Sequence, residues 1–439
     1  MTLKKRVVPQ AFWWDTTGRN LADMLDAAQY PEHVRRNFLR YYYDVICPAL
    51  GAPVTSSSFR SALSWDGSPI EYSYSLNGST KEPEVRLSVD LSPLHPQCLS
   101  WSDPLGSGVT HQVVEDLISR NGEADAGWYN TLREHFRVSV GSPEEARELV
   151  SRAGHKSSVM LGFDIERSAS VSSEDGSDTK IPAVGKVYFL PCLAAVSRNI
   201  TRWQVIRNAV QQLPTVYSVP QNIIKAFKTM EHFFADKTRE WEDSVRYLAT
   251  DLLPPHQTRL KIYTRCPSKT FDVAWDLFTL GGRIPGLERE KERFRDLFRE
   301  LVGEMSETEG EFETDVHKKV TICYHSLSAK HEYPVPKLFI CPRELVSNDS
   351  LVVSRLDKWL HENAWTRNSP GATTYRDLVE PIFTHRELSE RSGMHSFISI
   401  AQKNPVTRAL SIQTYFIPEL YSCRRTTPAV SRVESPSRE

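Results

Sequence analysis

The sequence lacks the features that mark several common protein classes. Its 439 residues carry a formal net charge of −1, which favours neither nucleic acid nor an acidic membrane surface as a partner. No stretch approaches the roughly 18 apolar residues that a membrane helix needs. The first residues, MTLKKRVVPQAFWW, are basic, but no apolar secretion segment follows them. We therefore predict no membrane span and no nucleic-acid partner.

Cysteine is sparse and scattered. None of the seven cysteines forms a C-x-x-C pair, which excludes the usual spacing of zinc and thiol redox motifs. An odd and dispersed set is typical of a reduced protein, so we expect a cytoplasmic location. The sequence also contains no two consecutive aspartates.

The composition is sufficient for a large core. Hydrophobic residues make up 40% of the chain, enough for two or three ordinary domains or for one large closed architecture. The end of the chain, residues 424–439, is rich in Ser, Pro and Arg and is predicted to be disordered. We expect residues 1–423 to form a single domain.

The most informative segment is Arg259-Leu260-Lys261-Ile262-Tyr263. In a strand, alternate residues point to the same face, so two cations and a phenol would lie side by side with two aliphatic residues behind them. A polar cavity that binds a polyanion needs such a wall. The pattern recurs as Lys186-Val187-Tyr188, Lys337-Leu338-Phe339 and, with an amide, Gln413-Thr414-Tyr415. One example alone commonly faces solvent, but the recurrence favours a shared chamber.

Strand pairs alternate with helices along the chain. Strand regions begin near residues 71, 158, 258, 318 and 395, and nine strands can be assigned, with a tenth expected near Cys266. Residues 200–251 are predicted to be a long helical region, and residues 374–392 a further helix. Hairpin strands are antiparallel, and a large sheet avoids exposed edges by closing. We predict an α+β fold: a ten-stranded antiparallel β-barrel with a central chamber, surrounded by α-helices.

Several segments together resemble a known family over residues 10–422. They are Ser68-Pro69-Ile70-Glu71-Tyr72-Ser73, Val85-Arg86, Gly185-Lys186-Val187-Tyr188-Phe189 with Pro191, the Arg259–Tyr263 segment, and Thr279-Leu280-Gly281-Gly282. The chain resembles the fungal dimethylallyltryptophan-synthase type of aromatic prenyltransferase. The resemblance implies a barrel of repeated αββα units, the ABBA fold. It also implies transfer of a dimethylallyl group from dimethylallyl diphosphate to an electron-rich arene, most often an indole, in secondary metabolism.

The resemblance also assigns roles to residues. It implies that Glu71 and Lys186 are catalytic, and that Ala62 and Leu63 lie with Glu71 near the acceptor. The implied diphosphate ligands are Arg86, Lys186, Arg259, Lys261 and Lys337, and the implied cation-shielding aromatics are Tyr188, Tyr263, Phe339 and Tyr415, with Tyr421 as an alternative to Tyr415. Relatives commonly carry an amide and a tyrosine where this chain has Lys337 and Phe339.

These residue types suit the chemistry. Lysine and arginine neutralise a diphosphate leaving group, and aromatic rings stabilise an allylic cation by about 1–2 kcal/mol each when desolvated. Glu71 as a carboxylate can accept a hydrogen bond from an indole N–H. Many prenyl-diphosphate enzymes bind magnesium through Asp-Asp-x-x-Asp, which is missing here. We therefore expect no required cofactor or metal, with enhancement by Mg²⁺ or Ca²⁺ left open.

Other interpretations stay open at this point. The acceptor could be a phenol or polyketide, or the protein could be a non-catalytic carrier of an isoprenoid diphosphate. The base that removes the proton from the alkylated ring could be Glu71, Glu166 or Lys186. Arg246 could contact an acceptor carboxylate, but it falls in a predicted helix, where a surface position is expected. The protein is expected to be a monomer or a homodimer.

Overall fold

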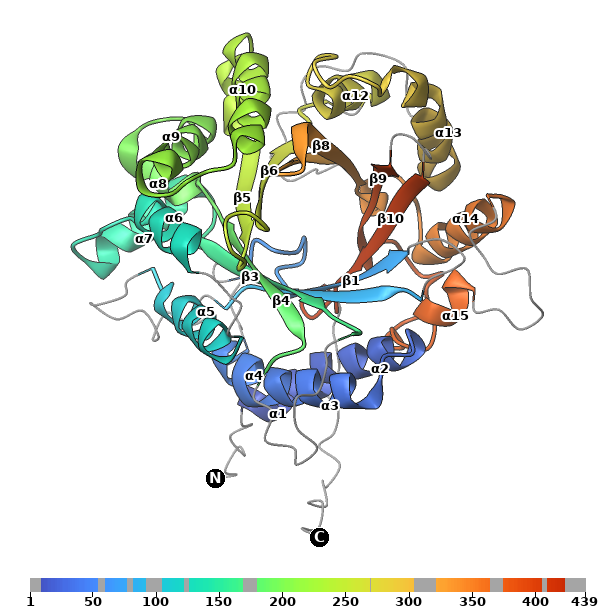
Figure 1. The fold of residues 1–439 in the computed structure, drawn as a ribbon. Helices are drawn as coiled ribbons and strands as arrows, with labels where there is room; N and C mark the ends of the chain where they lie inside the picture. The colour runs from blue at the N-terminus through green and yellow to red at the C-terminus, as the bar shows by residue number, and fades with distance from the viewer. Residues whose placement is uncertain are drawn as a thin grey trace, which may run out of the picture.

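A closed barrel of ten strands forms the centre of the protein, with helices around its outside (Figure 1). The structure, a computed structural model, describes residues 9–53, 60–76, 82–91, 105–121, 126–168, 180–268, 270–303, 321–363, 374–404 and 409–422. The predicted α+β class and ten-stranded antiparallel barrel are confirmed. The tail predicted at residues 424–439 lies outside the described residues.

The strands follow one another around the barrel in chain order. They are β1 (Ile70–Leu76), β2 (Glu84–Val89), β3 (Val159–Ile165), β4 (Ala183–Phe189), β5 (Val245–Asp251), β6 (Arg259–Arg265), β7 (Thr321–Ser328), β8 (His331–Ile340), β9 (His395–Asn404) and β10 (Ala409–Phe416). Each pairs antiparallel with its neighbours, and β1 closes the ring against β10, with Tyr72 opposite Phe416. Closure pairs the two strands that would otherwise be edges.

A group of helices precedes each pair of strands, as the αββα repeat predicts. The α-helices are α1 (Pro9–Trp13), α2 (Arg19–Ala27), α3 (Glu32–Tyr41), α4 (Cys47–Ala49), α5 (Gly108–Arg120), α6 (Gly127–Phe136), α7 (Pro143–Ala153), α8 (Cys192–Arg198), α9 (Arg202–Val216), α10 (Gln221–Ala235), α11 (Arg239–Asp243), α12 (Phe271–Thr279), α13 (Lys291–Val302), α14 (Asp349–Glu362) and α15 (Tyr375–Val379). Short π-helical segments are η1 (Trp14–Gly18) and η2 (Tyr42–Ile46), and 3₁₀ segments are η5 (Glu288–Glu290) and η6 (Pro342–Glu344). Within the described ranges, no helix is both long and apolar enough to cross a membrane.

The main core lies between the barrel and the helices. On β6, Leu260 and Ile262 are completely buried on the outer face of the sheet. Helix α10 packs against β7 and β8 through a buried stripe at helical spacing: Ile223, Phe227, Met230 and Phe234. Because the outer face of each strand is used for this packing, the inner face is free to carry polar side chains.

The tenth strand is not where the sequence predicted it. It is β5, Val245–Asp251, inside the region 200–251 that was predicted to be helical, and the expectation of a strand near Cys266 is wrong. On β5, Tyr247 and Ala249 lie opposite Tyr263 and Lys261 of β6, which is the period of two of a strand. No glycine or proline separates α11 from β5, so nothing in the local sequence marks the change.

The helix predicted at residues 374–392 is also wrong for most of its length. Helix α15 ends at Val379, and turns lead from there to β9. Pro381 follows two residues later. Proline lacks the N–H of a helical hydrogen bond and restricts the residue before it, so it accounts for this end.

Candidate active site

The repeated strand pattern converges on one cavity inside the barrel. Arg259, Lys261 and Tyr263 of β6 face Lys186 and Tyr188 of β4 across an interior cavity of about 70 Å³. We call this the narrow cavity. Side chains of β1, β2, β3, β7 and β10 complete its wall. Residues far apart in sequence thus share one chamber, which is what the alternation predicted.

Asp251 of β5 holds two of the cations. Arg259 Nε donates to Asp251 Oδ2 at 2.7 Å, and Lys261 Nζ donates to Oδ1 at 2.9 Å. Burial raises the pKa of Asp251, but Lys261, Lys186 and Arg259 outweigh it and hold that pKa below its usual range. Burial lowers the pKa of Lys261 to about 7, although Asp251 opposes the change. The carboxylate therefore helps Lys261 to stay charged in an enclosed site.

Asp164 of β3 holds two more cations. It forms an ion pair with Lys186 and a second one with Arg86 of β2, where Arg86 Nε lies 3.3 Å from Asp164 Oδ1. Burial raises the pKa of Asp164, yet Arg86 and Lys186 bring it below its ordinary value. Burial also lowers the pKa of Lys186 by more than Asp164 raises it. The two carboxylates thus fix four cations on one side of the chamber.

Lys337 of β8 is buried next to the narrow cavity, whose wall includes its partner Gln413, and it is held differently from the other cations. Its Nζ donates to Gln413 Oε1 at 2.5 Å, and the same oxygen accepts a hydrogen bond from the Tyr415 hydroxyl at 2.8 Å. Nζ also lies 5.6 Å from the centre of the Tyr324 ring. Burial, together with nearby cations, places the pKa of Lys337 well below its ordinary value.

Aromatic rings form a continuous layer beside the cations. The Tyr263 ring centre lies 6.0 Å from Tyr188, 5.1 Å from Tyr324 and 6.0 Å from Phe339. Phe339 in turn lies 5.5 Å from Tyr415. Tyr324 of β7 was not among the predicted aromatics, although it pairs directly with Lys337 on the neighbouring strand. Tyr247 of β5, whose ring centre lies 5.6 Å from that of Tyr263, was not predicted either. The layer therefore contains two more phenols than the sequence analysis proposed.

A second cavity of about 560 Å³ opens beyond this layer, and we call it the wide cavity. Ala62 and Leu63 line it together with Ser396 and Phe397 of β9. Phe397 lies 6.0 Å from Phe339, so the ring layer extends from the narrow cavity to the wide one. Glu71 of β1 is buried and accepts a hydrogen bond from Ser396 Oγ at 2.7 Å. The predicted acceptor residues are thereby brought to one region.

The wide cavity is rich in arginine. Its wall contains Arg60, Arg202, Arg246, Arg265 and Arg343. Arg246 belongs to β5, so its predicted position on a helix is wrong. In the described part of the chain, neither Arg202 nor Arg246 forms an ion pair. Burial and the charge of Arg246 lower the pKa of Arg202. This end of the chamber therefore carries positive charge that can act on a bound molecule.

Two alternatives from the sequence lie away from the narrow cavity. Glu166 is exposed just after β3. Tyr421 lies next to Arg60 and Asp66 of the wide cavity. Arg60 stacks over the Tyr421 ring at 5.0 Å, and the Tyr421 backbone N–H donates to Asp66 at 3.0 Å. The geometry thus leaves Glu71 and Lys186 as the predicted bases inside the chamber, and Tyr415 as the ring in the aromatic layer.

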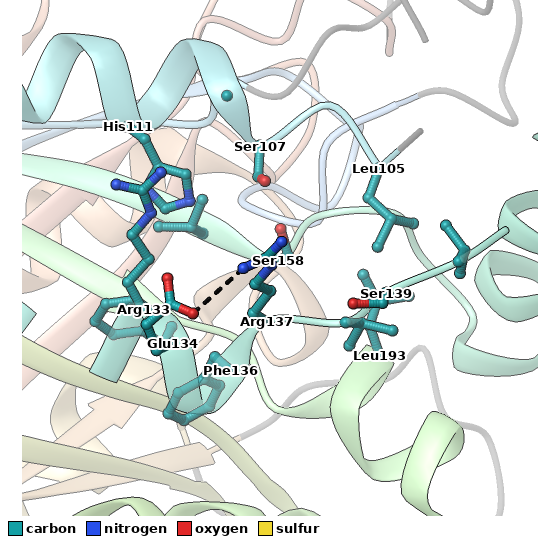
Figure 2. A pocket seen from close by; sticks show the side chains of 15 residues that line it. Leu105, Ser107, His111, Arg133, Glu134, Phe136, Arg137, Ser139, Ser158 and Leu193 are labelled. Carbon is teal, nitrogen blue, oxygen red and sulfur yellow. Dashed lines mark hydrogen bonds and ion pairs between the residues drawn. The ribbon is translucent and has the colours of Figure 1, made fainter. Parts of the chain in front are cut away.

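A third cavity, of about 430 Å³, lies outside the barrel near the start of α5 and the end of α6 (Figure 2). Arg137 at its edge pairs with Glu134 at 3.4 Å. None of the residues predicted to bind the donor or the acceptor lines it. Among the described residues, no group of three or more His, Cys, Asp or Glu side chains could hold a metal ion.

Sequence reasoning missed several residues of the chamber. Asp164 and Tyr324 alternate along their strands in the same way as the predicted cations, so the period of two could have identified them. Asp251 was missed because its strand was taken for a helix. Nothing in the local sequence indicated Ser396.

Comparison with known proteins identifies the family to which the chain belongs. The family model described as tryptophan dimethylallyltransferase matches residues 9–375. The chain is 39% identical to prenyltransferase phnF of Penicillium herquei, over 94% of this chain and 92% of that protein. It is 38% identical to the DMATS-type prenyltransferase mfmD of Annulohypoxylon moriforme, over 93% of this chain and 92% of that one.

Solved structures share the fold. The crystal structure of NotF in complex with brevianamide F and DMSPP superposes with a TM-score of 0.75 at 20% identity, covering 95% of this chain and 96% of that one. This likeness supports the barrel, whereas the family rests on the sequence matches. The chain belongs to the tryptophan dimethylallyltransferase family of prenyltransferases.

Proposed function

We propose that the protein transfers a dimethylallyl group from dimethylallyl diphosphate to an electron-rich aromatic acceptor, with an indole as the favoured acceptor. The observation that carries this proposal is the narrow cavity, where cations from separate strands meet a layer of aromatic rings. A cavity of this kind suits a molecule with a polyanionic end and an allylic group that becomes a cation.

The cations would bind and stabilise the diphosphate. Arg86, Lys186, Arg259, Lys261 and Lys337 supply the donors, and Arg can present two parallel N–H groups to phosphate oxygens. As the bond between the allylic carbon and oxygen breaks, these groups stabilise the charge that develops on the leaving oxygens. Protein side chains would then supply the positive charge that a metal supplies in other enzymes.

The rings would protect the allylic cation. The faces of Tyr188, Tyr263, Phe339 and Tyr415 attract positive charge by about 1–2 kcal/mol each when water is excluded. Phe339 can act in this way because the hydroxyl group is not part of the π face. Tyr324 extends the same surface, since its ring centre lies 5.6 Å from that of Phe339.

Glu71 would orient the acceptor from the other side of the layer. Ser396 donates to one of its oxygens and so helps to fix the carboxylate. An indole N–H donating to Glu71 would fix the ring and raise its nucleophilicity as positive charge grows on it. The carbon–oxygen bond breaks to give the allylic cation and free diphosphate, a ring carbon of the acceptor then bonds to the cation, and the ring loses a proton to a base. Glu71 and Lys186 are the candidates for this base.

The names of relatives leave the acceptor class open. A 7-dimethylallyltryptophan synthase from Aspergillus fumigatus is 24% identical to this chain, and xanthone prenyltransferase B from Emericella nidulans is 26% identical. One observation favours a second candidate function, the prenylation of an acidic phenol. Arg202 and Arg246 line the wide cavity, and arginine binds phenolate or carboxylate oxygens well.

A direct assay tests the proposal. The protein is incubated with dimethylallyl diphosphate and a panel of neutral indoles and acidic phenols, and products are followed by mass spectrometry. We expect a mass gain of one prenyl unit on at least one acceptor. Binding of the diphosphate without any product would instead support a non-catalytic carrier, and the absence of binding would contradict both.

A further inference from the structure

Lys337 differs from the other four cations of the chamber. Arg86 and Lys186 contact Asp164, and Arg259 and Lys261 contact Asp251. Within the described residues, Lys337 forms no ion pair, and its Nζ donates a hydrogen bond to the neutral amide oxygen of Gln413. Lys337 is only 5% exposed, so water compensates little for the missing carboxylate.

The groups that face Lys337 come from the strands on every side of it. The cations are Arg86 of β2, Lys186 of β4 and Lys261 of β6; the carboxylate is Asp164 of β3; the phenols are Tyr324 of β7 and Tyr415 of β10; and Gln413 of β10 is the amide. Asp164 is already shared by two other cations. Burial is the largest cause of the lowered pKa of Lys337, and the positive charges of Arg86, Lys186 and Lys261 lower it further. Burial, the neighbouring cations and the missing ion pair therefore all favour the neutral amine over the ammonium group at Lys337.

We propose that binding of the donor diphosphate is coupled to the uptake of one proton by Lys337, which then turns from Gln413 to the diphosphate. The proposal rests on the proposed function, because it assumes that the diphosphate occupies the narrow cavity. The proton comes from solvent and converts the amine to an ammonium group; no covalent bond is made or broken. A polyanion beside the amine favours the charged form, as any opposite charge within a few ångströms does.

With this coupling, Lys337 would carry a positive charge when the diphosphate is bound and would be neutral when it is not. The empty chamber avoids burying a further cation that has no carboxylate of its own, which is costly in an enclosed space. The occupied chamber gains an ammonium group beside the leaving oxygens, where positive charge stabilises the transition state. Lys337 would thus be a ligand of the donor whose charge appears only when the donor is present.

Calorimetry can measure this proton. Dimethylallyl thiolodiphosphate is titrated into the full-length protein at about pH 8, roughly two units above the second pKa of a phosphate group, so the ligand itself is fully ionised. The experiment is repeated in buffers of different ionisation enthalpy, and the dependence of the observed heat on that enthalpy gives the number of protons taken up. We expect the wild type to take up about one proton more than Lys337→Gln. We also expect the affinity of the wild type for the analogue to decrease as the pH rises. For each pH unit, this decrease should be about tenfold larger than the decrease for Lys337→Gln.

Two further variants separate the possible outcomes. Lys337→Arg keeps a permanent positive charge, so it should bind the analogue without taking up the additional proton. If Lys337→Gln does not fold, Lys337→Arg can replace it in the comparison with the wild type. Lys225→Gln changes an exposed lysine and should behave as the wild type. Equal proton uptake by the wild type and both Lys337 variants overturns the proposal. Failure of the wild type to bind the analogue overturns the proposed function instead.

Discussion

The two ends of the chamber carry positive charge in different ways. In the narrow cavity, two lysines and two arginines are held by the carboxylates of Asp164 and Asp251, whereas in the wide cavity Arg202 and Arg246 form no ion pair in the described part of the chain. An enclosed lysine loses its proton readily unless a carboxylate supports it. Arginine keeps its charge in almost any protein environment.

This difference implies that the two cavities would bind charged ligands in different ways. On the proposed function, a diphosphate entering the narrow cavity would compete with Asp164 and Asp251 for the cations, so its binding would be an exchange of counter-charges. An acidic group entering the wide cavity would meet Arg202 and Arg246, which have no ion pair among the described residues, and would need no such exchange. The first end suits a ligand with several charges, and the second suits one with a single charge.

The largest expected effect comes from the narrow cavity. Lys261→Ala removes a cation that would stabilise the leaving diphosphate, and we expect kcat to fall by about 100-fold to 1,000-fold, the range seen when one donor to a developing oxyanion is removed. Lys186→Ala should behave similarly. Steady-state kinetics with saturating acceptor measure the change.

Lys225→Ala is the matched control for these two variants. Lys225 lies on the exposed surface of α10 and pairs with Glu332, so its removal should leave kcat unchanged. Normal turnover by Lys261→Ala and Lys186→Ala would show that the narrow cavity does not bind the diphosphate.

A smaller effect is expected from Glu71, at the other side of the ring layer. Glu71→Ala removes the proposed anchor for an indole N–H, and a hydrogen bond to a charged group is worth about 1.5–3 kcal/mol. We expect kcat/KM for the acceptor to fall by roughly tenfold to 100-fold, with little change in the affinity for dimethylallyl thiolodiphosphate. If indole prenylation is untouched in this variant, the acceptor assignment is wrong.

The arginines of the wide cavity should affect only some acceptors. Arg246→Gln should raise KM for an acidic phenol by about tenfold, since about 1.4 kcal/mol corresponds to one charged hydrogen bond, and should leave KM for a neutral indole unchanged. Arg207→Gln is the control, because Arg207 lies on the outer surface, pairs with Glu231 at 2.9 Å and lines neither cavity. Equal changes for both classes of acceptor would argue against a role in charge recognition.

Much of the fold and part of the site could be read from the sequence. Lys186, Lys261 and Tyr263 were predicted to share a chamber because strand alternation is a local property, and the structure places them together. The strand β5 was missed because its pairing with β4 and β6 is a tertiary interaction that overrides a weak local signal.

Contacts between distant segments were harder to predict. The hydrogen bond from Ser396 to Glu71 joins residues at opposite ends of the chain, and it depends on the closure of β1 against β10 and β9. No local pattern encodes such a contact. Of the two carboxylates that hold the cations, Asp251 was missed because its strand was taken for a helix, and Asp164 was missed although alternation along β3 could have identified it.

The smallest expected effect is on stability, and it tests the claim that the narrow cavity is an enclosed site for lysine. The folded state releases the proton of Lys261 near its pKa of about 7, whereas an unfolded lysine keeps its proton until about pH 10.4. Between these values the unfolded state binds more protons, so the free energy of unfolding contributed by this group rises with pH. Lys261→Met should remove that contribution and lower the slope by up to about 1.4 kcal/mol per pH unit. Denaturant unfolding of the wild type and Lys261→Met across this pH range measures the difference. Lys225→Met is the control and should keep the wild-type slope. Identical slopes for Lys261→Met and the wild type would mean that Lys261 is as well solvated as a surface lysine.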